Sequence, residues 1–118
     1  MFYKIISLLK KSNIVSEIEI LEFVEEETVN ILKVKAKLID KSLLYITEVH
    51  TMNYQKYSYH WQDKEGKTII RWDNSPHWKE IETFPHHKHI GEQVLPSSRA
   101  TIKDVLKEIE KIILSDQD

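Results

Sequence analysis

The sequence predicts an α+β fold, in which an antiparallel five-stranded meander is packed by an N-terminal and a C-terminal helix. Apolar residues recur at helical spacing near both ends of the chain. Between residues 14 and 73 the period of the apolar residues changes to two, which is typical of strands with one buried face. The connections between these segments are short, so segments that follow one another along the chain are expected to pair.

Length and composition indicate one domain over residues 1–118. No run of about 18 apolar residues exists, so we expect no membrane span. The apolar start of the chain is interrupted by Lys4 and ends in Lys10 and Lys11 without a small-residue cleavage site, which favours a first helix over a signal peptide. We therefore expect a cytoplasmic protein.

The chain has no cysteine, which excludes disulfides, thiol nucleophiles and thiolate metal sites. Abundant Lys, Glu and Ile with few Gln and Asn favour a thermophilic source. The net charge of −2 hides six glutamates in residues 14–30 and a run of lysines in residues 31–41. These blocks are either solvated faces of strands or stripes that meet a charged partner, and the overall charge alone does not indicate nucleic-acid binding.

The elements follow in order. Phe2, Ile5, Ile6 and Leu9 predict a helix over residues 2–11, which Ser12 and Asn13 end. The predicted strands span residues 14–24, 32–38, 43–49, 55–63 and 68–73, with a bulge near Ile20 and Leu21, where the alternation slips.

At the other end, Thr101 and Asp104 have capping-box spacing, and an apolar stripe from Ile102 to Ile113 predicts the second helix. We expect this stripe to be buried against the apolar face of the meander. Between the last strand and this helix lies a long loop over residues 74–98 with all three prolines and four of the six histidines, which favours a functional segment.

The last two strands form a hairpin whose register the sequence selects. A two-residue turn at Glu65-Gly66 would pair Lys64 with Lys67 and gather the aromatic residues on one face. The predicted cross-strand pairs are Trp61–Ile70, Tyr59–Trp72, His60–Arg71 and Ser58–Asp73, and a slip of one residue would bring Arg71 into the aromatic face.

The same register places His60, Arg71, Ser58 and Asp73 on the face away from the aromatic residues. Histidine suits proton transfer near neutral pH, and the planar guanidinium of arginine suits a phosphate. The alternative is an ordinary solvent-facing set of polar residues.

The histidine loop has three interpretations. It could hold a metal ion with His77, His86 and His89, completed by Asp73 or water, although the spacing matches no standard zinc signature. It could provide metal-free acid/base chemistry on a phosphodiester. We prefer this interpretation, under which the protein uses no cofactor and no metal. It could also be a packed polar loop or a protein-binding surface. The two glycines exclude a Gly-rich phosphate loop.

Three stretches of the chain resemble a known family: YSYHWQD at residues 57–63, RWDNSPH at 71–77 and TFPHHKH at 83–89. They are similar to the motifs of the TumE-like toxins, formerly a domain of unknown function, over about residues 43–112. The resemblance implies a small prokaryotic toxin of a toxin–antitoxin module, whose partner is an antitoxin with a DNA-binding helix-turn-helix domain. It supplies no established catalytic residues.

We therefore expect a type II toxin that is a metal-independent ribonuclease acting on RNA. The protein could also form an oligomer. The candidate catalytic residues are His60, Arg71, Asp73, His86, His87, His89 and Tyr57. The candidate substrate-binding residues are Ser58, Lys88 and His77. The alternatives are a non-catalytic protein-interaction module, or an enzyme that modifies tRNA or nucleotides, including a metal-dependent one that uses the histidine loop.

Overall fold

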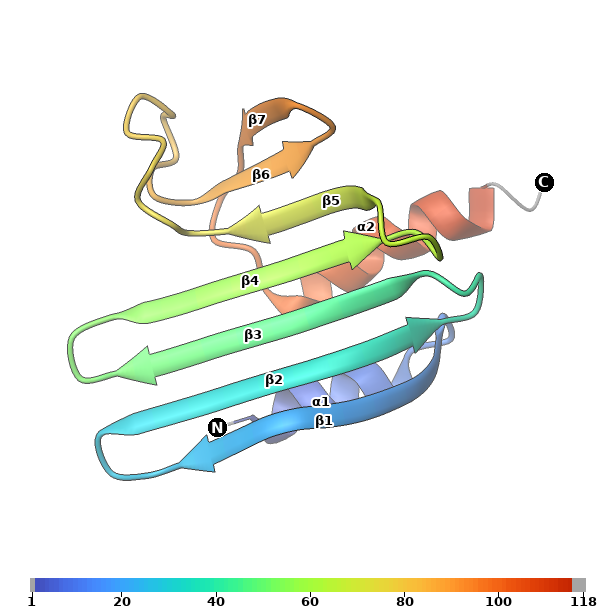
Figure 1. Cartoon of the computed structure of the whole chain (residues 1–118), viewed down its shortest axis with the longest axis horizontal. Helices are drawn as coiled ribbons and strands as arrows, with labels where there is room; N and C mark the ends of the chain where they lie inside the picture. The colour runs from blue at the N-terminus through green and yellow to red at the C-terminus, as the bar shows by residue number, and fades with distance from the viewer. Residues whose placement is uncertain (1, 116–118) are drawn as a thin grey trace.

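A computed structural model describes residues 2–115 and shows two helices packed on one antiparallel sheet (Figure 1). The helices are α1 (Tyr3–Lys11) and α2 (Ile102–Ser115). The strands, which pair in sequence order, are β1 (Val15–Glu25), β2 (Val29–Leu38), β3 (Leu43–Thr51), β4 (Gln55–Gln62), β5 (Thr68–Asp73), β6 (His87–Ile90) and β7 (Gln93–Pro96). The α+β class and the antiparallel meander are confirmed, but the prediction of five strands is wrong, because the described chain forms seven.

The two additional strands lie within residues 74–98, where the sequence predicts a loop. β6 and β7 form a hairpin in which Ile90 pairs with Gln93, and Gly91 takes the positive φ of 60° that the tight turn requires. β6 also pairs with β5, so the hairpin extends the sheet instead of standing alone. Each strand is only four residues long, which is too short to show a clear alternation of apolar and polar residues.

Both helices lie on the same face of the sheet, behind it in Figure 1. The strand residues that point to them form the core, including Leu32 and Val34 of β2 and Tyr59 and Trp61 of β4, all at most 1% exposed. Ile109 of α2 is fully buried against this layer. The opposite face of the sheet is covered by no helix among the described residues, and we call it the open face.

The start of α2 has the predicted capping box. The hydroxyl and the backbone N–H of Thr101 both donate to Asp104 Oδ2, at 2.8 and 3.0 Å, and the backbone N–H of Asp104 lies 3.3 Å from Thr101 Oγ1. These bonds lower the pKa of the Asp104 carboxyl, because they stabilise its charged form. The cap and the apolar stripe therefore act together to fix where this helix begins.

The β4–β5 register agrees with the prediction, but the turn does not. Ser58–Asp73, Tyr59–Trp72, His60–Arg71 and Trp61–Ile70 pair as expected. Asp63 donates its backbone N–H to the carbonyl of Lys67 at 2.8 Å, so the loop has three residues and the predicted Lys64–Lys67 pair is wrong. The Asp63 carboxylate accepts the backbone N–H groups of Glu65 and Lys67, which stabilises the longer turn. A register shift next to Trp61 restores the predicted pairing.

The predicted bulge in the first strand is confirmed by a register shift between Ile20 and Glu22. No helix within residues 2–115 is long and apolar enough to cross a membrane.

Candidate active site on the open face

Three polar side chains line up across three adjacent strands. His60 of β4 pairs with Arg71 of β5, and Arg71 pairs with His89 of β6. Paired residues on neighbouring strands point to the same face of a sheet. Because Tyr59 and Trp72, the sequence neighbours of His60 and Arg71, point into the core, these three side chains lie on the open face. Two imidazoles thus flank one guanidinium, and we call these residues the His–Arg–His row.

Asp73 lies on the same face of β5 as Arg71, two residues further along the strand, and it holds Arg71 in place. Its carboxylate is nearly buried, and Arg71 Nε lies 3.1 Å from Oδ2. The backbone N–H and the hydroxyl of Ser75 donate to Oδ1, at 3.0 and 2.8 Å. Asp73 therefore holds the guanidinium at a fixed place through a charge-assisted contact.

Two histidines of β6 approach the same carboxylate. His87 is 1% exposed, and its Nδ1–H donates to the carbonyl of Pro85 at 2.9 Å. His87 Nε2 is 3.0 Å from Asp73 Oδ1, yet the ring is not aligned for a hydrogen bond, and Nε2 has no partner among the described residues. His89 Nε2 lies 3.7 Å from Asp73 Oδ2. His87 is therefore too buried to reach a substrate, whereas His89 is accessible.

A cleft of about 360 Å³ opens above these residues. Trp78 forms one wall and meets the ring of His89 edge-on, with ring centroids 6.0 Å apart. His77 also borders the cleft and is exposed. The remaining lining is polar and comes mainly from Lys56, Ser58, Arg71, Asp73 and Ser75. A phosphate group in this cleft would meet Arg71, Ser58 and His89 together.

The environment lowers the pKa of both accessible histidines of the row. Burial is the larger cause for His60, and the charge of Arg71 adds to it. Burial is also the larger cause for His89, where the charge of Asp73 opposes the shift and His87 and Arg71 add to it. Both imidazoles are therefore mainly neutral near pH 7, which is the state that a general base needs. His60 Nε2 additionally lies 2.7 Å from Thr68 Oγ1, which orients its ring.

Three of the sequence-predicted residues lie on the helix side of the sheet. His86 stacks on Tyr57, and its Nδ1 is 2.9 Å from the Tyr57 hydroxyl. Lys88 donates to Glu108 Oε1 of α2 at 2.9 Å. The cleft is lined by Arg71, Asp73, His89, Ser58 and His77, whereas His60 and His87 lie beside Arg71 and Asp73 without lining it. His86 and Lys88 do not line the cleft, and Tyr57 borders it although its side chain is buried in the core.

Sequence reasoning missed Trp78 and Ser75. The position of Ser75, two residues after Asp73, is a signal for a local Asp–Ser turn, and it could have been recognised. Trp78 had no such signal, because its contact with the histidines depends on the path of the loop.

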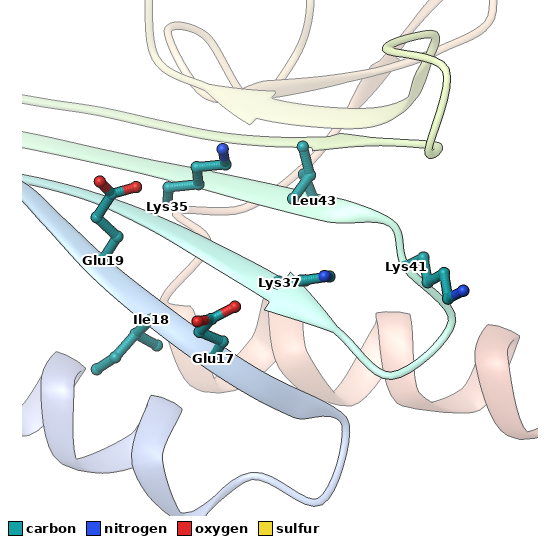
Figure 2. Close-up of a pocket in the computed structure, with 7 residues that line it drawn as sticks. All are labelled: Glu17, Ile18, Glu19, Lys35, Lys37, Lys41 and Leu43. Atoms are coloured by element: carbon teal, nitrogen blue, oxygen red, sulfur yellow. The ribbon is translucent and has the colours of Figure 1, made fainter.

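Another hollow of the open face lies between β1 and β3, with a volume of about 720 Å³ (Figure 2). Glu17 and Glu19 lie near Lys35 and Lys37 there, whereas Ile18 points to the other side, toward the helices. The glutamates and lysines of this hollow are cross-strand neighbours, and its lining has neither histidine nor arginine. It therefore offers no group for proton transfer near neutral pH, and the histidine cleft is the better candidate for chemistry.

Comparison with known proteins identifies the family. No curated protein and no solved structure matches the chain. The family model described as Toxin TumE matches residues 5–113, which include every strand and both flanks of the cleft. The chain therefore belongs to the TumE toxin family, and it is a toxin whose partner is the antitoxin of a toxin–antitoxin system.

Proposed function

We propose that this toxin is a metal-independent endoribonuclease of a type II module and that its active site is the His–Arg–His row. The observation that carries the proposal is the placement of two accessible imidazoles on either side of Arg71. In this arrangement the central cation binds the scissile phosphate, one imidazole removes a proton from the attacking hydroxyl, and the other donates a proton to the leaving oxygen. This set needs neither a thiol nor a metal ion.

The chemistry follows from the roles of the three residues. His60 takes the proton of a ribose 2′-hydroxyl, and the oxygen attacks the adjacent phosphorus. The bond from phosphorus to the 5′-oxygen breaks, and His89, in the minor protonated form that is present near neutral pH, gives its proton to that oxygen. The products are a 2′,3′-cyclic phosphate and a free 5′-hydroxyl. Arg71, held by Asp73, stabilises the charge that builds up on the phosphate oxygens.

The proposal is tested by incubating the purified protein with total RNA, with and without a chelator. We expect cleavage that resists the chelator and leaves cyclic phosphate ends. His60→Gln and Arg71→Gln should each lower the rate by about 10²-fold or more, since acid/base and charge stabilisation contribute at this level. His86→Gln, on the opposite face, is the matched control and should keep the rate. Equal loss in all three variants, or cleavage that needs a metal, contradicts the assignment.

The biological part of the proposal concerns the partner and the cell. We propose that the antitoxin carries a helix-turn-helix domain and that its reading frame abuts that of the toxin. Expression of the toxin alone should arrest growth, and the His60→Gln and Arg71→Gln variants should not. Arrest that persists in both variants without any RNA cleavage would instead favour a non-catalytic interaction module.

A further inference from the structure

We propose that Asp73, His87 and His89 form a binding site for a divalent transition-metal ion such as zinc(II). Each residue offers one ligand atom, and these atoms all lie within 4.8 Å of one another. Two imidazole nitrogens and one carboxylate oxygen are a common ligand set for such ions. The site goes beyond the proposed ribonuclease chemistry, which uses no metal.

His87 provides the main evidence for this site. Its Nδ1–H is committed to the carbonyl of Pro85, so the lone pair of the neutral ring is on Nε2. This Nε2 is buried, lacks a hydrogen-bond partner within residues 2–115, and is only 3.0 Å from Asp73 Oδ1. Two electron-rich atoms this close need a proton or a cation between them, since otherwise they repel each other and remain desolvated.

The distances fit a bound ion. Ligand atoms at about 2.1 Å from zinc lie about 3.0 Å apart at a right angle and about 3.4 Å apart in a tetrahedron. His87 Nε2 and Asp73 Oδ1 are 3.0 Å apart, and His89 Nε2 and Asp73 Oδ2 are 3.7 Å apart. These two distances end on different oxygens of Asp73, and the three ligand atoms spread over 4.8 Å, so the partly exposed His89 ring would have to move inward by about 1 Å to complete the site.

The surroundings also resemble those of a metal centre. A ligating histidine usually donates its second ring N–H to a carbonyl or carboxylate, as His87 does to Pro85. Ser75 and Arg71 hold the carboxylate of Asp73 in place. The alternation of β6 explains the sequence spacing, because His87 and His89 share one face. His86 lies on the other face, so the set of His77, His86 and His89 considered from the sequence is not the set that the structure gathers.

An ion can enter and exchange at this place. The side chain of His89 is 26% exposed, and both His89 and Asp73 line the cleft. Water or a phosphate oxygen from the cleft would fill the remaining coordination positions of the ion. Nitrogen ligands favour zinc, cobalt and nickel over magnesium and calcium, which prefer sites built from oxygen.

Occupation of the site has a consequence for the proposed enzyme. A metal on His89 Nε2 takes the nitrogen that would protonate the leaving oxygen, so zinc(II) should inhibit cleavage. This consequence rests on the proposed function, whereas metal binding itself does not depend on it.

The test is a calorimetric titration of the full chain with zinc(II), followed by imidazole ¹⁵N NMR. We expect one equivalent to bind and to shift the resonances of His87 and His89 but not those of His60 and His86. His87→Ala and His89→Ala should weaken binding at least about tenfold. His86→Ala, one residue away on the other face, is the matched control. The NMR shifts in the unmodified protein test the site even if a variant fails to fold.

The outcomes separate the two proposals. Absence of binding, equal binding of magnesium(II), or shifts at His60 or His86 in place of His87 and His89 overturns the metal site. Zinc binding at His87 and His89 by a protein whose metal-free form cleaves no RNA supports the metal site and overturns the ribonuclease proposal. Cleavage that appears only after zinc is added supports the site and overturns metal-independent catalysis.

Discussion

At the scale of single residues, Arg71 is the proposed phosphate-binding group, and its charge also contributes to lowering the pKa of His60. Burial and the guanidinium charge each lower the pKa of this histidine below its ordinary value of about 6.5. The neutral ring is therefore the major form at pH 7, and a base in this position loses activity only when the pH falls below 6.5.

Histidine NMR titration checks this directly. We expect the pKa of His60 to lie below 6.5 in the unmodified protein and to rise in Arg71→Gln, because one of the two causes is removed. It should not reach the ordinary value, since burial is the larger cause. A pKa of His60 above 6.5, or one that Arg71→Gln leaves unchanged, would contradict the electrostatic coupling of the pair.

How much of the site could be predicted varies from residue to residue. The pairs His60–Arg71 and Ser58–Asp73 were predictable because apolar and polar residues alternate on both strands and only one register buries the aromatic side chains. The choice between His86 and His87 was not, since it depends on where β6 begins and which phase its pairing with β5 imposes. Local sequence carries no sign of that phase.

At the scale of elements, α2 shows why the C-terminal helix was predictable. Its apolar stripe has the helical period, and the cap at Thr101 fixes its start. β6 and β7 were missed because each has only four residues, and β6 carries a single apolar residue, Ile90, so neither shows a strand pattern. Gly91, between two four-residue segments, was the remaining signal for that hairpin. In the β4–β5 hairpin the turn was predicted one residue too short, but the bulge near Trp61 compensates for it.

The buried stripe of α2 gives a stability prediction. Ile109 is fully buried, so Ile109→Ala should lower the free energy of unfolding by about 2–5 kcal/mol through lost burial and a residual cavity. Leu114 of the same helix is 43% exposed and serves as the control, and Leu114→Ala should change stability by about 0.5 kcal/mol or less. The measurement is urea denaturation, in which the slope of the unfolding free energy against urea concentration should be the same for all variants. Similar losses in both variants would mean that α2 is packed differently.

At the scale of the whole molecule, the sheet separates two polar networks. On the helix side, the buried carboxylate of Glu48 accepts the Tyr59 hydroxyl at 2.6 Å and lies 2.9 Å from His50 Nε2 and 3.7 Å from Arg99 Nη2. Burial and the charge of Glu48 raise the pKa of Tyr59, so its hydroxyl stays a donor. This network joins β3, β4 and the segment before α2 on the helix side of the sheet.

On the open face, a line of side chains runs across β2 and β3 to the site that we propose binds RNA. Lys35 of β2 pairs with Tyr45 of β3, and Tyr45 pairs with His60, so a cation and an aromatic ring continue the His–Arg–His row toward β1. Lys33 is paired with Glu22 at 3.4 Å, whereas Lys35 forms no ion pair within 4.0 Å among the described side chains. If RNA crosses the face along this line, Lys35 meets a phosphate and Tyr45 meets a base.

Lys35→Gln should therefore weaken RNA binding and make it less sensitive to salt. Each lost phosphate contact lowers the slope of log affinity against log salt by about 0.7 for a single strand. Lys111→Gln is the matched control, because Lys111 is an exposed lysine on α2, on the other side of the sheet. Binding of an uncleavable RNA analogue, measured over a range of salt concentrations, gives both slopes. If the two variants behave alike, RNA reaches Arg71 by another path, and the lysines of β2 are only the solvated partners of the glutamates on β1.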